Sequence, residues 1–270
     1  MQPAEPSGQE LRQAALHWLA ETDPAAKCHG VKALRQHWLD GSLALDAGVV
    51  LTPLPAIPGR PLQPVLVPPK ELSRRAMHTI AGRAAMIHAL AHIEFNAINL
   101  ALDAIWRFSG LPPQFYADWL QVAGEEALHF ELLHRHLNRL GHGYGDFPAH
   151  GGLWEMAQRT EDDVLARLAL VPRILEARGL DVTPGLCARL AQAGDHAAAA
   201  ILDIILRDEI GHVRIGNHWY AWLCAQRGLD PLDTGALLAE RYRSPAPRGP
   251  FNVEARRAAG FSEQELAGLA

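Results

Sequence analysis

Two copies of the motif Glu-x-x-His, each preceded by an acidic residue, are the part of this sequence best suited to chemistry. The first copy pairs Glu126 with His129, and the second pairs Glu209 with His212. Residues three positions apart on an α-helix point to nearly the same side, about one turn apart. Each pair can therefore bind one metal ion through a carboxylate and an imidazole.

A further helical carboxylate lies upstream of each motif. Glu94 precedes Glu126 by 32 residues, and Glu176 precedes Glu209 by 33 residues. The first spacing fits an antiparallel helix pair, because the chain runs roughly 24 Å from Glu94 to the Gly-Leu-Pro-Pro break at 110–113 and roughly 20 Å back to Glu126. The second half repeats the plan. The sequence therefore predicts two helical hairpins, each offering a Glu and then Glu-x-x-His.

This ligand set is typical of four-helix bundles that hold two iron or manganese ions. Four carboxylates supply four negative charges, which offset two divalent ions, and each imidazole fixes one ion while leaving coordination positions open. We therefore predict an all-α protein with a dinuclear metal site whose ligands are Glu94, Glu126, His129, Glu176, Glu209 and His212. Glu176 is the ligand whose height the spacing defines least, since it lies beyond a predicted kink at Pro172 and in the last turn before a break at Gly179.

The acids directly before the motifs, Glu125 and Asp208, are predicted to orient the histidines. Metal-bound imidazoles usually donate their other N–H to a carboxylate. We assign Asp208 to His129 and Glu125 to His212. The competing interpretation is that these carboxylates form buried salt bridges with arginines, for which the candidates are Arg173, Arg207 and Arg214.

A third Glu-x-x-His, formed by Glu131 and His134, lacks the preceding acid and lies about 140° from the Glu126 face at 100° per residue. We interpret Glu131 and His134 as polar residues at the surface or at a helix–helix contact. Trp119 and Val122 lie on the Glu126 face and are predicted to line a pocket. His88 and His92 point away from Glu94 and are predicted to be structural histidines, with a role behind the ligands as the alternative.

The periodicity of apolar residues divides the chain into three parts. Residues 1–69 are predicted to hold two helices, near 9–20 and 31–39, and an extended wrap with seven prolines between 41 and 69. Residues 70–227 are predicted to form the bundle, and residues 228–270 a helical extension. The predicted bundle helices cover about 71–108, 114–140, 160–178 with a continuation at 184–193, and 195–227; the extension holds helices at 231–242 and after Ser262. Thr160 with Asp163 and Ser262 with Glu265 are predicted capping boxes, and Asp195 is the predicted N-cap of the fourth bundle helix.

Composition excludes several other classes. The chain has 270 residues, a net charge of −5 and no long basic run, which gives no support for nucleic acid binding. No stretch approaches 18 uninterrupted apolar residues, and the first six residues have no signal-peptide character, so we expect a cytoplasmic protein without a membrane span. The three isolated cysteines, at 28, 187 and 224, indicate neither a disulfide framework nor a zinc site.

The motifs resemble those of the ferritin-like superfamily, and more closely a bacterial family of ferritin-like proteins defined as a domain of unknown function. The resemblance covers about residues 70–227. The matching stretches are residues 92–94, 122–130, 175–184 and 208–213. It implies a ferritin-like four-helix bundle with a dinuclear site formed by the six ligands given above.

The leading hypothesis is an O₂-activating di-iron oxidase or monooxygenase that acts on an unknown small organic substrate and takes electrons from an external donor. Two iron ions are the expected cofactor, with a manganese–iron pair or two manganese ions as alternatives. The alternative functions are ferroxidase or iron handling without an organic substrate, and tRNA modification. A large cage would favour storage, whereas a monomer or homodimer with a substrate pocket would favour an enzyme.

Overall fold

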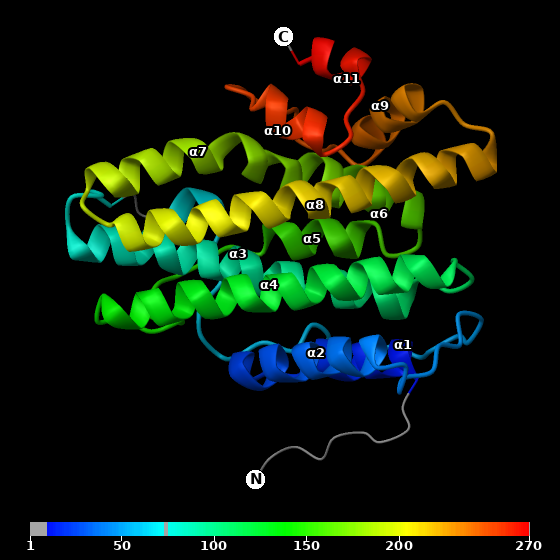
Figure 1. The fold of residues 1–270 in the computed structure, drawn as a ribbon, viewed down its shortest axis with the longest axis horizontal. Helices are drawn as coiled ribbons and strands as arrows, with labels where there is room; N and C mark the ends of the chain where they lie inside the picture. The colour runs from blue at the N-terminus through cyan, green and yellow to red at the C-terminus, as the bar shows by residue number, and fades with distance from the viewer. Residues whose placement is uncertain (1–9, 73–74, 270) are drawn as a thin grey trace. The chain divides into compact units, whose positions relative to one another are not determined.

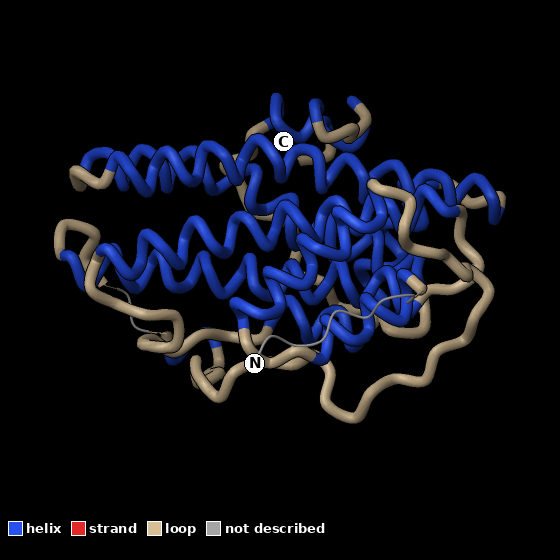
Figure 2. The backbone as a smooth tube through the Cα atoms, turned by 60° about the horizontal axis from the view of Figure 1, so that its bottom comes forward, coloured by secondary structure: helices blue, strands red, loops and turns tan. Residues whose placement is uncertain are grey.

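The structure, a computed structural model, describes residues 10–72 and 75–269, which fall into two compact units. Of the described residues, the first unit takes in 10–72 and 85–150, and the second takes in 75–84 and 151–269. The regular elements in the described part are all helices, with two isolated β-bridges and no strand (Figures 1 and 2). The prediction of an all-α, bundle-like protein is confirmed, while the predicted domain boundaries at 69 and 227 stay predictions.

The first unit is built on a long helical hairpin covered by two shorter helices. Proline at the first position of α2 and of α4 suits a helix start, because proline lacks the amide hydrogen that would be unsatisfied there. Gly124 of α4 faces Arg35 of α2, and an added Cβ would lie 2.7 Å from the Arg35 side chain. The elements are α1 (Leu11–Ala20), α2 (Pro24–Leu39), the 3₁₀ turn η1 (Pro69–Glu71), α3 (Ile80–Arg107), of which residues 80–84 belong to the second unit, and α4 (Pro113–Arg139).

The proline-rich wrap is ordered by specific contacts, as predicted. Buried Lys27 donates hydrogen bonds to the carbonyl oxygens of Leu19 and Gly59 and to Oδ1 of Asn99, which ties α1, the wrap and α3 together. Further along, the wrap pairs with residue 149 through backbone hydrogen bonds from Val67 N to Ala149 O, 2.8 Å, and from Ala149 N to Val65 O, 3.0 Å. The three acceptors around Lys27 satisfy all three protons of its buried ammonium group.

The first long helix begins at Ile80 rather than near residue 71, which corrects the sequence prediction. Thr79 supplies the reason, because its Oγ1 accepts a hydrogen bond from the amide of Gly82 and so caps the first turn. The preceding prolines form only the short turn η1. The second helix, α2, extends further than expected and starts at Pro24, with Asp23 as its N-cap.

The second unit is a helical hairpin overlaid by short helices. α7 and α8 lie side by side along much of their length (Figure 1). The N-cap Asp195 starts α8 as predicted, and Ser262 with Glu265 forms the predicted capping box. The elements are α5 (Gly152–Arg159), α6 (Val164–Leu170), η2 (Val171–Glu176), α7 (Ala177–Gln192), α8 (His196–Arg227), α9 (Pro231–Arg241), α10 (Val253–Ala258) and α11 (Glu263–Ala267).

The third bundle helix differs from its prediction at both prolines. Instead of a kink at Pro172, the chain forms a π-helix over η2. Instead of ending at Gly179, α7 continues through Pro184. Proline at 184 leaves the carbonyl of Leu180 without its helical partner, and Nδ2 of Asn252 donates to that oxygen at 3.2 Å. A contact distant in sequence therefore replaces the missing hydrogen bond.

The predicted capping box at Thr160 and Asp163 is also wrong. Thr160 ends α5 and its hydroxyl donates to Met156 O, while Asp163 alone caps α6 by accepting from Leu165 N. Two short helices, α5 and α10, were not predicted. Both lie in segments rich in glycine, proline or arginine, where short helices leave little periodicity to detect.

One helix, α3, is long and apolar enough by length and composition to cross a membrane. However, 72 % of its most apolar window is buried inside the structure. Such burial is typical of the core helix of a soluble protein.

Candidate metal site

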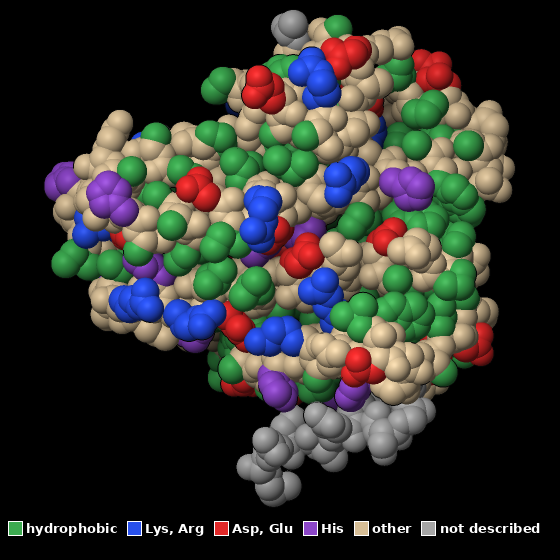
Figure 3. All heavy atoms as spheres, in the orientation of Figure 1, with side chains coloured by type: hydrophobic (Ala, Val, Ile, Leu, Met, Phe, Trp, Pro, Cys, Tyr) green, Lys and Arg blue, Asp and Glu red, His purple; other side chains and the backbone are tan. Residues whose placement is uncertain are grey.

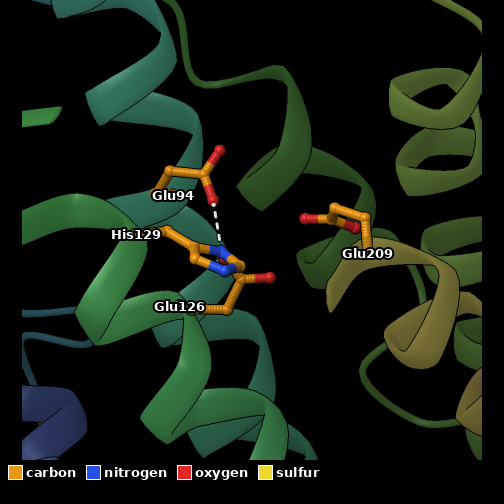
Figure 4. A group of neighbouring side chains, drawn as sticks. All are labelled: Glu94, Glu126, His129 and Glu209. Carbon is orange, nitrogen blue, oxygen red and sulfur yellow. Dashed lines mark hydrogen bonds and ion pairs between the residues drawn. The ribbon is translucent and has the colours of Figure 1, made fainter. Parts of the chain in front are cut away.

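Three of the predicted ligands come together inside the first unit. Nδ1 of His129 lies 3.2 Å from Oε2 of Glu94 and 3.4 Å from Oε2 of Glu126. Figure 4 shows Glu94 reaching His129 from the neighbouring helix, and also labels Glu209, which belongs to α8 of the second unit. The three side chains form what we call the Glu–Glu–His cluster.

The cluster follows from helix geometry. Glu126 and His129 lie one turn apart on α4, as the motif requires. Glu94 lies at the same height on α3, as the 32-residue spacing predicts for an antiparallel hairpin. All three side chains are at most 4 % exposed. The sequence therefore predicted both the members of this cluster and their mutual approach.

Burial and mutual contact shift the pKa values of the cluster residues. Burial and the neighbouring carboxylate of Glu126 raise the pKa of Glu94 well above its usual range. Burial disfavours the imidazolium of His129, but the hydrogen bonds and charges of Glu126 and Glu94 outweigh it and raise the pKa of His129 to about 11. The metal-free cluster therefore holds protons between its buried carboxyl groups and the imidazole.

A metal ion fits this arrangement. The candidate ligand atoms of the three side chains all lie within 4.8 Å of one another. Ligand atoms that share one ion at about 2.0–2.2 Å stand roughly 3 Å apart, close to the 3.2 and 3.4 Å observed. Carboxylate and imidazole together suit transition metals such as iron, manganese and zinc. The cluster can therefore bind a metal ion in exchange for its protons.

The second unit holds the matching half of the predicted ligand set. Nδ1 of His212 lies 3.8 Å from Oε1 of Glu209, one turn away on α8. His212 is fully buried and Glu209 is half-buried. Glu176 is half-buried at the last position of η2. The pair on α8 has the expected geometry, and the membership of Glu176 in a metal site stays a prediction.

The acids before the motifs have contacts on the protein surface. Glu125 accepts a hydrogen bond from Gln121 at 3.0 Å and lies 3.8 Å from Arg35, and Asp208 pairs with Arg207 at 2.8 Å. The Arg207 pair is one that the competing salt-bridge interpretation named. The assignment of these acids to the two histidines stays a prediction.

Buried apolar and aromatic side chains flank the cluster residues along α3 and α4. Phe95 and Phe130, each adjacent in sequence to a ligand, have ring centroids 5.6 Å apart. Trp119 and Val122, the predicted pocket wall, are buried on α4. The indole N–H of Trp119 has no hydrogen-bond partner among the described residues.

His88 and His92 are held by structural contacts. His88 Nε2 accepts from the amide of Gly145 at 3.0 Å, and His92 Nδ1 lies 2.8 Å from the hydroxyl of Tyr144. Burial lowers the pKa of each imidazole to about 4, so both are neutral at pH 7. The partner Tyr144 comes from a glycine-rich loop, and nothing in the sequence indicated its contact with these histidines.

The third Glu-x-x-His motif makes contacts with α2 and with a neighbouring aromatic ring. Glu131 pairs with Lys32 of α2 at 2.5 Å, and the ring of His134 lies against Phe130 with centroids 5.5 Å apart. These are the polar and packing contacts predicted for this face of α4.

A cavity of about 320 Å³ lies in the second unit, beside Arg173, Asn217 and Tyr220. Its polar side chains are paired with one another: Arg173 donates to Asn217 at 2.6 Å and to Glu265. Arg173, a charged group beside this cavity, is therefore paired within its own unit. On the face shown in Figure 3, lysine and arginine side chains are interspersed with acidic ones and form no single basic patch.

Comparison with known proteins places the chain in one family. A protein of Haemophilus influenzae described as uncharacterized is 49 % identical over 257 residues, which covers 92 % of this chain and 89 % of that protein. No solved structure matches. Residues 20–267 match the family described as "Protein of unknown function (DUF455)", and the chain, with its buried Glu–Glu–His cluster, belongs to that family.

Proposed function

We propose that this protein is a dinuclear carboxylate oxidoreductase of the ferritin-like kind, which uses two iron ions to oxidise a small organic substrate with O₂. The observation that carries the proposal is the buried Glu–Glu–His cluster, in which two carboxylates and an imidazole face one another at 3.2 and 3.4 Å. Burying two acids side by side is unfavourable, so a cation-binding role explains why the core contains them.

The repeat of the ligand pattern supports two ions rather than one. Glu209 and His212 on α8 have the same three-residue spacing as Glu126 and His129 on α4. With Glu94 and Glu176 they complete four carboxylates and two imidazoles, which is the ligand set of dinuclear four-helix proteins. In the proposed site Glu125 and Asp208 orient the histidines from outside the ligand shell.

The reduced metal pair would supply the O₂ chemistry, and the protein would supply position and a dry environment. The ligand side chains of the Glu–Glu–His cluster are themselves almost fully buried, which keeps bulk water away from them. Trp119 and Val122 would form the apolar wall against which a small substrate packs. An external donor would return the metals to the reduced state between turnovers.

The first experiment is metal content per chain after anaerobic loading with Fe²⁺, with Mn²⁺ in a parallel sample. We expect about two ions per chain, and oxygen consumption on exposure to air. A folded protein that binds neither metal would overturn the proposal, because the carboxylates would then be structural.

Assembly state in the same preparation separates enzyme from storage. A monomer or dimer that holds two ions per chain supports the oxidoreductase. A large cage that takes up many ions per chain would instead establish iron storage.

A further inference from the structure

The backbone that carries Glu176 is irregular and depends on contacts from elsewhere in its unit. Glu176 is the last residue of the π-helix η2, in which the amide of Ala177 donates to the carbonyl of Pro172, five residues back. A π-helix packs less favourably than an α-helix and is found mostly as a single turn, frequently at functional sites. The direction of the Glu176 side chain therefore depends on what holds this turn.

One side of the π-helix rests directly on α8. Gly216 lies opposite Pro172, and a Cβ built at Gly216 would stand 2.5 Å from the Cβ of Pro172. A glycine is needed for this close approach, since any side chain would displace the proline. The contact sets the distance between η2 and the helix that carries Glu209 and His212.

The other contacts come from α8 and from the C-terminal end of the chain. Arg173, next to Pro172, is only 10 % exposed and donates to the carboxylate of Glu265 in α11. Its Nε donates to Oδ1 of Asn217 on α8 at 2.6 Å, and Nδ2 of Asn217 donates to the carbonyl of Ala259 at 2.7 Å. The guanidinium also lies 4.1 Å from the centre of the Tyr220 ring.

A second group of contacts holds the helix that follows η2. Arg256 forms a buried ion pair with Asp181 of α7, with Nη2 and Oδ2 2.6 Å apart. Asn252 donates to the carbonyl of Leu180, which Pro184 leaves without a helical partner. The C-terminal residues thus support the chain on both sides of Glu176, at the two places where proline interrupts the helix.

We propose that residues 250–269, which we call the C-terminal clamp, position Glu176 for metal binding, with Glu265 and Arg173 as the positioning residues. The inference rests on the proposed function, because it gives Glu176 the role of a ligand. Glu265 is itself fixed by its capping box with Ser262, so the ion pair presents Arg173 in one orientation. Loss of the pair frees η2 to return to an α-helical or frayed turn, which redirects Glu176.

The test replaces Glu265 by Gln and compares it with Glu263→Gln. Glu263 lies in the same helix and pairs with Arg257, but both partners are half or more exposed. We expect Glu265→Gln to weaken the binding of one Fe²⁺ ion about 10-fold, as loss of a group behind a ligand commonly does, and Glu263→Gln to leave both ions unchanged. Anaerobic Fe²⁺ titration measures the two steps.

A double variant separates positioning from general destabilisation. In a Glu176→Gln background, Glu265→Gln should cause no additional loss of Fe²⁺ affinity, since its effect passes through Glu176. Additive losses would overturn the inference. Hydrogen exchange of the metal-free protein gives a second readout, in which the amides of residues 171–177 should exchange faster in Glu265→Gln than in Glu263→Gln.

The outcomes distinguish this inference from the proposed function. If wild-type protein binds two Fe²⁺ ions and Glu265→Gln binds them equally well, the clamp has no role in the site and the proposed function stands. If wild-type protein binds none, the proposed function fails and the role of Glu176 as a positioned ligand fails with it.

Discussion

The two helical hairpins carry the same ligand pattern on differently built helices. In the first unit, α3 and α4 run without interruption past Glu94, Glu126 and His129, and the three side chains meet. In the second unit, the helix before α8 contains a π-helix and an internal proline, and contacts from α10 and α11 support it. Sequence spacing places a side chain reliably where the helix is regular, and elsewhere its position depends on distant contacts.

The largest difference should appear when equivalent histidines are removed. His129→Ala deletes a member of the preformed Glu–Glu–His cluster, so we expect at least about 100-fold weaker metal binding and loss of most bound metal. His212→Ala should remove about one ion of two, because the first unit keeps its three ligands. Elemental analysis after identical Fe²⁺ loading measures both, and equal losses would contradict the asymmetry.

The next largest effect should be a loss of stability of the first unit at acid pH. His88 is fully buried and its Nε2 accepts a hydrogen bond, so its pKa is lowered to about 4. The unfolded chain binds a proton at His88 below about pH 6.5, whereas the folded chain binds it only near pH 4. This contribution to stability is therefore complete above pH 6.5 and is lost as the pH falls toward 4, up to about 3 kcal/mol.

Replacing His88 by Gln tests this assignment. The Gln side chain can accept the hydrogen bond from Gly145 but does not titrate. Urea unfolding of metal-free protein at pH 7 and pH 4.5 should show a smaller loss of stability in the variant than in wild type. An unchanged pH dependence would assign the acid sensitivity to other groups.

Glycine contacts test the two units separately. Gly30→Ala in the first unit would place a Cβ 2.3 Å from the Trp18 ring, and Gly216→Ala in the second would place one 2.5 Å from Pro172. We expect each change to reduce the free energy of unfolding by about 1–3 kcal/mol. Gly216→Ala alone should also weaken metal binding, because it moves η2.

Gly185→Ala is the control for both glycine changes. An added Cβ at Gly185 of α7 meets no atom within 4 Å, so we expect up to about 1 kcal/mol of stabilisation from helix propensity. Weaker metal binding in Gly30→Ala than in Gly216→Ala would break the proposed link between the π-helix and the site.

A smaller effect should follow when one of the two adjacent acids in the cluster is replaced by its amide. Glu94→Gln leaves one carboxylate and one imidazolium in the cluster, so we expect the metal-free protein to gain about 1 kcal/mol of stability while losing metal binding. Such opposite changes are typical of residues kept for function. A loss of stability in the metal-free variant would mean that Glu94 supports the fold.

The sequence predicted the approach of Glu94, Glu126 and His129 well and the course of the helix that carries Glu176 only in part. Glu94, Glu126 and His129 follow from helix periodicity alone, because a regular antiparallel hairpin fixes their heights. Pro172 was expected to kink its helix, and no local pattern shows that Gly216 on α8 leaves room for a π-helix there. Continuation of α7 through Pro184 depends on Asn252, a residue 68 positions away. Such compensating contacts are tertiary and leave no periodic signal.

The smallest expected effect comes from the third Glu-x-x-His motif, and it tests which face of α4 binds metal. Glu131 pairs with Lys32 on a partly exposed surface, and such pairs contribute at most about 1 kcal/mol. We therefore expect Glu131→Gln and His134→Ala to leave metal content at the wild-type value and to change stability only slightly. Loss of metal in either variant, with Glu126→Gln still loaded, would move the site to the opposite face of the helix. The buried cluster of Glu94, Glu126 and His129 would then be a structural network that holds α3 against α4.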